Sequence, residues 1–287
     1  MSGASFFLRI LVVSLFFVQS AWSGSYPWLG SYSLGDAIVN RIPAPAGCRR
    51  VEVEQSSFAY WLRHLPLKKG DPPVRLYDGR LKSNQSVHFA VVDIDVGTRD
   101  LQQCADAVIR LRAEYLYSRG DYSAIHFNFT SGHRADFARW IEGYRPVVKG
   151  NSVRWVRSAE RDVSYRSFRE YLDRVFEFAG TLSLSRELAP VSDVRDMRIG
   201  DVFVQGGFPG HAAIVVDMVE CERAGDRLFI LAQSYMPAQD IYIPRNPTEP
   251  ALDPWYRLDF GDELKTPEWT FRRRDLRRFK TRTQQGE

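Results

Sequence analysis

The chain has 287 residues and a formal net charge of +4, and hydrophobic residues make up 44% of it. That length suffices for one large domain or two small ones, and so mild a charge does not indicate a nucleic-acid partner. Its three cysteines, Cys48, Cys104 and Cys221, allow at most one disulfide and leave one thiol over. Cys48 and Cys221 lie near turn-like or charged sequence and are the candidates to pair, but spacing alone does not establish the pairing.

The N-terminal segment has the order of a secretory signal peptide: Arg9, an apolar run over residues 10–18, and the small-residue segment Ala21-Trp22-Ser23. The run is too short for a helix that spans a membrane. We therefore expect residues 1–23 to be removed and the rest to be exported, to the periplasm or beyond; an uncleaved anchor is the alternative. No later stretch approaches about 18 consecutive apolar residues, so we predict no transmembrane segment after cleavage.

Hydrophobic periodicity and turn residues predict helices and strands along the chain. In order they are a short amphipathic helix over residues 56–67, a strand over 87–96, a helix over 101–116, a helix over 164–184 with Gly180 as a stop, two strands around a glycine-rich turn over 200–218, and a strand over 227–235. Helices come early and strands late, which predicts an α+β fold with helices packed on an antiparallel sheet. No linker divides residues 24–287, so we expect one domain with an N-terminal extension and a basic, solvated C-terminal tail at 272–282.

Cys104 lies at the start of the helix that follows the first predicted strand. Asp100 is a suitable N-cap, and Gln103 stands three positions later, as in a capping box. Cys104 then falls in the first turn on the apolar face, while Arg110 and Glu114 supply part of the opposite, polar face. The first-turn N–H groups and the helix dipole favour a thiolate and would also hold a developing oxyanion. The alternative is a small apolar residue in the core.

His211 begins the strand that follows the glycine-rich turn. Gly207 and Gly210 precede it, and glycines at such a place let a ligand or another backbone come close. Because side chains alternate along a strand, Ala213 shares its face and leaves room for a neighbouring element. A lone histidine here reads as a satisfied surface residue, but together with Cys104 it becomes a candidate general base for the thiol.

A cysteine–histidine pair usually has a third group that orients the imidazole. Asp217 shares the face of the histidine but lies six residues along the strand, which is about 20 Å. Gln233 on the next strand projects to that face if a three-residue hairpin loop pairs Arg223 with Arg227, whereas a two-residue loop would send it to the opposite face. We prefer the first register because it places Gln233 beside the histidine; Asp240 is the second choice.

The segment over residues 126–146 combines aromatic rings with hydrogen-bonding groups. His126, Asn128 and Trp140 are predicted to bind substrate there, since such surfaces suit sugars or peptide stems. Gln103, Gly207 and Gly210 are the other predicted substrate contacts. The alternative is a strand and helix whose aromatic side chains belong to the core. No third ligand stands near His126 and His133, so we expect no metal and no cofactor.

Six segments together resemble a bacterial family of exported proteins classed as a domain of unknown function. They are DIDVGTRDLQQCADAVIRLRAEYLYS, IHFNFTSG, TLSLSREL, GDVFVQGGFPGHAAIVVDM, LAQSYMPAQDIYI and TPEWTF. The resemblance runs over roughly residues 40–275 and by itself implies no activity. More remotely, the chain order is similar to that of papain-like cell-wall amidases and endopeptidases of the CHAP and NlpC types. Those enzymes place a nucleophilic Cys at a helix start, a His at a strand start and a polar residue on the next strand.

Cys104, His211 and Gln233 match that order one by one, and Gln103 matches the Gln-Cys pair of the CHAP type. The third residue of those enzymes is more usually His, Asn, Asp or Glu, and their compact members have a shorter spacing between Cys and His. The remote resemblance implies a papain-like hydrolase whose Cys104 attacks an amide or ester carbonyl. Peptidoglycan is the expected partner, and an acyl ester is the other candidate substrate. The rival interpretation is a non-catalytic cell-envelope binding module that holds wall glycan or peptide in an aromatic cleft.

Overall fold

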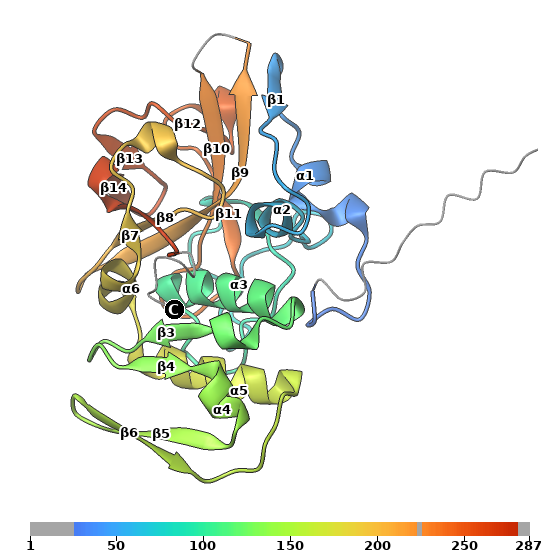
Figure 1. Ribbon diagram of the computed structural model, residues 1–287. Helices are drawn as coiled ribbons and strands as arrows, with labels where there is room; N and C mark the ends of the chain where they lie inside the picture. Colours follow the sequence, from blue (N-terminus) through green and yellow to red (C-terminus); the bar gives the residue numbers. More distant parts are fainter. Residues whose placement is uncertain (1–25, 223–225, 281–287) are drawn as a thin grey trace, which may run out of the picture.

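The computed structural model describes residues 26–222 and 226–280, so the predicted signal peptide at 1–23 lies outside the described residues. The predicted α+β class is confirmed, with helices packed against antiparallel strands (Figure 1). The main sheet has the strand order β12-β10-β9-β8-β15-β7, and β1 also pairs with β9. Its strands are β1 (Cys48–Arg50), β7 (Ala189–Pro190), β8 (Val202–Gln205), β9 (His211–Cys221), β10 (Arg227–Ala232), β12 (Tyr256–Arg257) and β15 (Leu276–Arg278).

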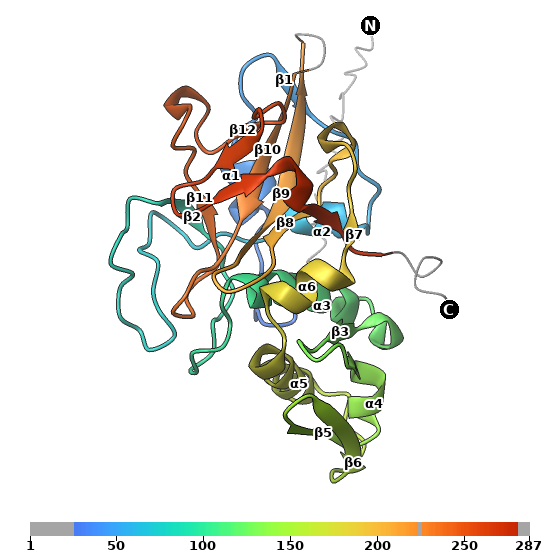
Figure 2. The ribbon, with the colours of Figure 1, turned by 90° about the vertical axis from the view of Figure 1, so that its left-hand side faces the viewer.

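Helices and two-stranded sheets complete the fold. The helices are α1 (Ile38–Arg41), α2 (Phe58–Arg63), α3 (Cys104–Ser118), α4 (Phe137–Ile141), α5 (Tyr165–Phe178) and α6 (Thr181–Glu187). The small sheets pair β2 (His88–Val91) with β11 (Tyr242–Pro244), β3 (His126–Asn128) with β4 (Arg134–Asp136), β5 (Tyr144–Lys149) with β6 (Ser152–Arg157), and β13 (Glu263–Lys265) with β14 (Thr270–Arg272). Figures 1 and 2 show α3 between the main sheet and a unit formed by α4, α5, β5 and β6.

The predicted elements are present, with shifted boundaries. The helix predicted over 56–67 is limited to α2, where the Ser57 side chain accepts the Tyr60 N–H at 3.1 Å as an N-cap. The strand predicted over 87–96 is limited to β2. Gly180 does separate two helices, as predicted, because α5 ends at Phe178 and α6 begins at Thr181.

Strand β9 is the centre of the molecule. Its first nine residues are buried, which is typical of a continuous apolar strand that is covered on both faces. It pairs with β1, β8 and β10, and α2 and α3 lie against it. The buried Asp217 within it accepts hydrogen bonds from Arg50 at 2.8 Å and Arg63 at 2.6 Å, so this carboxylate attaches the N-terminal segment to the sheet.

The register between β9 and β10 differs from the predicted one. Arg227 pairs with Glu220, so the preferred pairing of Arg223 with Arg227 is wrong; Arg223 itself lies outside the described residues. A β-bulge between Ile230 and Leu231 then shifts the register by one residue. Because one residue of shift exchanges the two faces of a strand, the bulge returns the following residues to the face of His211. The predicted face was right, but a bulge and not the hairpin loop produces it.

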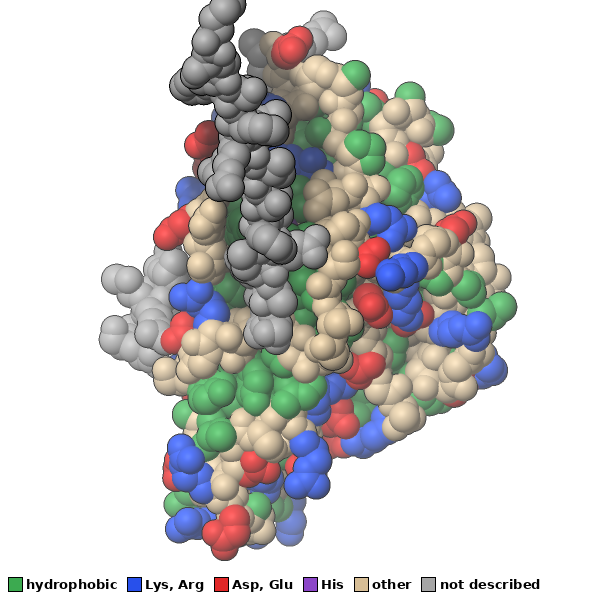
Figure 3. All heavy atoms as spheres, turned by 90° about the vertical axis from the view of Figure 1, so that its right-hand side faces the viewer, with side chains coloured by type: hydrophobic (Ala, Val, Ile, Leu, Met, Phe, Trp, Pro, Cys, Tyr) green, Lys and Arg blue, Asp and Glu red, His purple; other side chains and the backbone are tan. Residues whose placement is uncertain are grey.

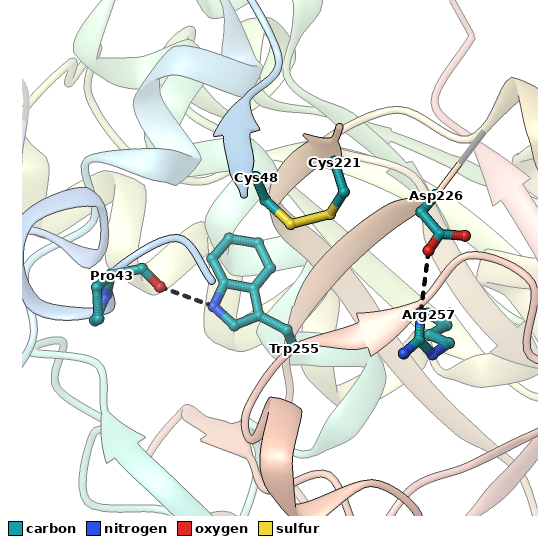
Figure 4. The surroundings of a disulfide bond; sticks show 6 residues. All are labelled: Pro43, Cys48, Cys221, Asp226, Trp255 and Arg257. Atoms are coloured by element: carbon teal, nitrogen blue, oxygen red, sulfur yellow. Dashed lines mark hydrogen bonds and ion pairs between the residues drawn. A yellow bond between two sulfur atoms is a disulfide. The ribbon is translucent and has the colours of Figure 1, made fainter. Parts of the chain in front are cut away.

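A disulfide joins the ends of β1 and β9. Cys48 and Cys221 are directly opposite each other in the sheet and are bonded (Figure 4). The nearby Trp255 donates its indole N–H to the Pro43 carbonyl at 3.0 Å. Cys104 is therefore the free cysteine of the chain.

The middle of α3 carries a buried ion pair. Arg110 Nε and the Glu114 carboxylate are 2.5 Å apart, and both side chains are inaccessible to solvent. Gln102 accepts from Arg110 at 2.9 Å, and the Tyr165 hydroxyl donates to Glu114 at 2.7 Å. The polar face predicted for this helix is therefore buried at Arg110 and Glu114, where Gln102 and Tyr165 bond to the two side chains.

The predicted solvated tail belongs to the main sheet over its described residues. Strand β15 pairs with β7 and β8, and Arg278 makes an ion pair with Asp201 at 2.6 Å. The expectation of a free tail is wrong for residues 276–278, because cross-strand bonds and the buried Asp201 carboxylate hold the segment. On the face of the molecule that Figure 3 draws, Lys and Arg side chains are interspersed with Asp and Glu. Over residues 26–222 and 226–280, no helix has the length and apolarity needed to cross a membrane.

Candidate active site

Cys104 is the first residue of α3. The N-cap is Gln103 and not Asp100, so the helix begins three residues later than predicted. The Asp106 carboxylate accepts the Gln103 backbone N–H at 3.1 Å, which is the reciprocal bond of a capping box. Asp100 instead accepts from the Gln103 side chain at 3.1 Å and from the Ala238 N–H at 2.7 Å. These bonds fix the helix start that presents the thiol.

The sulfur of Cys104 lies at the junction of α3 and β9. The backbone N–H groups of Cys104, Ala105 and Ala212 are close enough to favour its thiolate. The first two belong to the first turn of α3, and the third directly follows His211 in β9. The side chain is partly exposed to a cleft that His211 also lines. The structure therefore brings the two predicted catalytic residues to one site.

The electrostatics of the thiol are opposite to the expected ones. Burial, with a smaller effect of Asp106, raises the pKa of Cys104 to about 11. Burial also raises the pKa of Asp106 to about 8, so this carboxyl is protonated at neutral pH and repels a thiolate less there. The expectation that the helix end lowers the thiol pKa is therefore not met in the unliganded protein, because lost hydration outweighs the nearby N–H groups.

His211 is held in a buried aromatic cage. Its side chain is nearly inaccessible, and its ring centroid lies 5.0 Å from Tyr235, 5.3 Å from Trp269 and 5.7 Å from Phe271. Its Nε2 is 3.1 Å from Gln233 Oε1, as predicted. Burial lowers the pKa of His211 to about 4, against smaller upward effects of Gln233 and Glu268. The imidazole is therefore neutral at pH 7 and able to accept a proton.

A chain of buried polar groups continues behind Gln233. The amide Nε2 of Gln233 donates to the Tyr242 hydroxyl at 2.7 Å, and that hydroxyl donates to the Glu268 carboxylate. Glu268 also forms an ion pair with Lys82 at 2.6 Å. Burial and Glu268 raise the pKa of Tyr242 well above its ordinary value, so the proton stays on the tyrosine. We call His211, Gln233, Tyr242, Glu268 and Lys82 the polar chain.

The polar chain determines which nitrogen of His211 carries the proton. A carboxylate that is paired with Lys82 only accepts hydrogen bonds, so the single proton of Tyr242 points to Glu268. The tyrosine oxygen must then accept from the Gln233 amide NH₂, which turns the amide oxygen toward the histidine. Nε2 is therefore the protonated nitrogen of the neutral ring, and Nδ1 keeps the lone pair that a general base needs.

The cleft at Cys104 has a volume of about 660 Å³. One wall is the loop before His211, which packs on α6: Thr181 Oγ1 donates to the Gly207 carbonyl at 3.1 Å. A Cβ on Gly210 would approach Thr181 Oγ1 to 2.4 Å, so this glycine is needed for the close approach. Three residues that were predicted to contact substrate line the cleft: Gln103, Gly207 and Gly210. At Gly210 the element that comes close is α6.

Three predicted substrate contacts lie elsewhere. Trp140 is buried and donates to Ser167 at 3.0 Å, so it belongs to the core. His126 and Asn128 line a separate cavity of about 260 Å³, near the C-terminal end of α6. The predicted aromatic cleft wall is thus wrong, because its rings pack inward on α5. Asp240 is also excluded as the orienting residue, since it binds Lys68 at 2.9 Å and the Arg75 N–H at 2.8 Å.

Six residues of the site were not predicted from the sequence. Tyr235, Trp269 and Phe271 pack on His211, and Tyr242, Glu268 and Lys82 continue the polar chain. All but Lys82 lie in the two segments LAQSYMPAQDIYI and TPEWTF, which carry part of the family resemblance. Their place in those segments was the available signal. Among residues 26–222 and 226–280, no group of three or more His, Cys, Asp or Glu is arranged to hold a metal ion.

Comparison with known proteins gives one match. The model of the family described as "Domain of unknown function (4846)" matches residues 38–278. No curated protein and no solved structure matches the chain.

Proposed function

The chain belongs to this family of unknown function, and from that premise we propose that it is an exported, papain-like cysteine hydrolase of the cell envelope. It cleaves an amide or ester bond, and peptidoglycan is the first substrate to test. One observation carries the proposal. Cys104 and His211 line the same cleft, with the Ala212 N–H at the sulfur and Gln233 on the histidine.

The proposed reaction begins with a neutral pair. Cys104 Sγ attacks the substrate carbonyl carbon while its proton passes to His211 Nδ1. The carbonyl oxygen becomes an oxyanion, for which the first-turn N–H groups of α3 are the donors. When the tetrahedral intermediate collapses, the bond to the leaving amine or alcohol breaks, and His211 returns the proton to it. Water then attacks the thioester with the same histidine as base, which releases the acid and restores the thiol.

The neutral resting pair is consistent with this order of events. A thiol pKa of about 11 and an imidazole pKa of about 4 leave no ion pair before the substrate binds. Proton transfer must therefore accompany attack. Gln233 holds the ring in the required tautomer. When His211 becomes an imidazolium, the polar chain behind it stabilises the positive charge.

The test is hydrolysis by the mature chain and its Cys104→Ala and Cys104→Ser variants. Purified peptidoglycan and a set of small amides and esters are incubated with each protein, and released amines, alcohols and acids are measured by mass spectrometry. We expect products with the wild type alone. A trapped thioester on Cys104 would identify the nucleophile. Equal product release by Cys104→Ala would refute the proposal.

The rival function is a binding module without turnover, and the raised thiol pKa favours it. In that case Cys104→Ser binds peptidoglycan as tightly as the wild type, and no substrate acylates Cys104. Sedimentation with purified peptidoglycan, measured beside the hydrolysis assay, separates the two functions.

A further inference from the structure

The cleft at Cys104 has a rim of two exposed apolar side chains. Phe208 is 97% exposed and Met236 is 52% exposed. Phe208 lies three residues before His211, and Met236 lies three residues after Gln233, so both rim residues are attached to the site itself. We propose that this cleft binds a straight, uncharged acyl or alkyl chain of the substrate, with Phe208 and Met236 closing over it. The inference rests on the proposed function and narrows its substrate class to acyl-chain amides and esters.

The position of Phe208 is built into the fold. Its loop is attached to α6 by the bond from Thr181 to the Gly207 carbonyl at 3.1 Å. A Cβ at Gly206 would meet Ser185 Oγ at 2.1 Å, so the loop lies against the helix more closely than any other residue would permit. Phe208 and Met236 both line the cleft, and apolar groups gathered at one cleft, unlike a single exposed ring, mark a binding surface.

The charge of the cleft excludes an anionic substrate group. Of the described residues that line it, none is Lys or Arg. Two of its three acidic side chains are paired: Asp100 accepts from Gln103 and Ala238, and Glu177 binds Arg99 at 2.5 Å and Arg174 at 2.7 Å. The third, Asp106, accepts the Gln103 N–H through Oδ2, and its buried Oδ1 has no hydrogen-bond partner among the described residues. A carboxylate or phosphate would therefore lose hydration without gaining a cation.

Other apolar side chains line the same cleft as the rim residues and the thiol. They include Leu101, Phe176, Leu182 and Trp269. The volume of about 660 Å³ lies within the range of small-molecule sites, about 300–1,000 Å³. Methionine has three rotatable bonds and adapts its shape to apolar partners of varied form. An extended acyl chain would thus gain burial along the wall and bring its carbonyl to Cys104.

Alkylation of Cys104 by N-alkylmaleimides measures chain binding without turnover. The second-order rate constants for methyl, ethyl, butyl, hexyl and octyl maleimide are measured at pH 9 and divided by those for glutathione. We expect an increase of about two- to fourfold for each methylene that enters the cleft. Cys104 is the free cysteine of the chain, so the mass of the adduct reports this residue.

Variants of the rim test where the chain binds. Phe208→Ala is expected to lower the octyl-to-methyl rate ratio about tenfold, and Met236→Ala to lower it less, while Phe208→Leu retains most of it. Leu34→Ala is the matched control, since Leu34 is 45% exposed but does not line the cleft. The inference would be overturned if the wild-type rate constants did not rise with the length of the alkyl chain. It would also be overturned if Phe208→Ala left the octyl-to-methyl rate ratio unchanged.

The same data separate this inference from the proposed function. A rising series without Cys104-dependent hydrolysis means that the cleft binds chains but the protein is not a hydrolase. Hydrolysis of peptidoglycan, together with rate constants that do not change with the length of the alkyl chain, means that the protein is a hydrolase whose substrate places another group in the cleft. N-phenylmaleimide is measured beside the alkyl series. A rate constant raised for the phenyl but not for the octyl reagent would assign the cleft to an aromatic group and refute the acyl chain.

Discussion

Two cavities lie at opposite ends of α6, and they differ in charge and in construction. The cleft at its N-terminal end has Cys104 and His211, apolar walls and no described Lys or Arg. The cavity at its C-terminal end has His126, and most of its charged lining is basic. Residues that line both were predicted to bind one substrate: His126 and Asn128 line the second, and Gln103, Gly207 and Gly210 line the first. The structure separates them.

The difference shows what makes a histidine suited to catalysis. His211 has one ring nitrogen bonded to Gln233, and a chain of buried groups fixes its tautomer. His126 lies 3.6 Å from Glu187, and neither of its ring nitrogens makes a hydrogen bond in the described part of the chain. One imidazole is therefore oriented for proton transfer, and the other is not.

Replacement of the nucleophile should have the largest effect. Cys104→Ala is expected to lower hydrolysis by at least about a thousandfold, because no other thiol is available. Initial rates on the best substrate measure the effect, and thermal unfolding checks that the fold is kept. Activity within tenfold of the wild type would remove Cys104 from the mechanism.

Loss of the general base comes next. His211→Ala is expected to lower kcat about 10²- to 10⁴-fold. In the wild type, kcat/KM should fall below about pH 4, where His211 becomes protonated and no longer accepts the thiol proton. A pH–rate profile measures this, and a midpoint near pH 6.5 would contradict the buried, neutral imidazole.

The polar chain should give an intermediate effect. Tyr242→Phe breaks the bonds to Gln233 and Glu268 and frees the amide to turn, which we expect to lower kcat about ten- to a hundredfold. Tyr256→Phe is the matched control, since its hydroxyl is also buried and donates to the Arg245 carbonyl away from the site. Equal losses of kcat in both variants would indicate a general loss of stability. A positioning role predicts a lower kcat with a nearly unchanged KM in Tyr242→Phe alone.

Cys104 should react with alkylating reagents as a buried, neutral thiol does. Iodoacetamide alkylation of Cys104 is expected to rise with pH to an apparent pKa above the free value of about 8.5, and His211→Ala should leave that value nearly unchanged. Burial raises the thiol pKa, so the reactive thiolate forms only at high pH. An apparent pKa below about 8.5 that rises in His211→Ala would instead establish a preformed ion pair.

The smallest effect is expected at the other end of α6. His126→Ala and Arg186→Ala should change hydrolysis less than about twofold, because surface changes away from a site cost little. Both residues line the other cavity and not the cleft at Cys104. A loss of more than tenfold in either variant would mean that substrate extends across α6, and the two cavities would then form one site.

Much of the site follows from local sequence. The placement of Cys104 in a first helical turn and of His211 at a strand start came from periodicity and turn residues. The fold class came from the same patterns. Gln233 was chosen because it is polar, through a hairpin register that is wrong. The cap of α3 was misplaced by three residues, since Asp100 is a preferred N-cap type and Gln103 is not. In the folded chain Asp100 instead accepts from the Gln103 side chain and the distant Ala238 N–H.

Long-range contacts decided the rest. A bulge between Ile230 and Leu231 places Gln233 on the same face of the sheet as His211. No residue type in that apolar run predicts a bulge. Glu268 reaches Tyr242 across 26 residues of chain, and Lys82 reaches Glu268 from the other side of the site. Residue order along the chain is enough to predict which residue types stand at the ends of α3 and β9. Their charge states follow from the folded structure, because burial depends on what packs around a group and not on its neighbours along the chain.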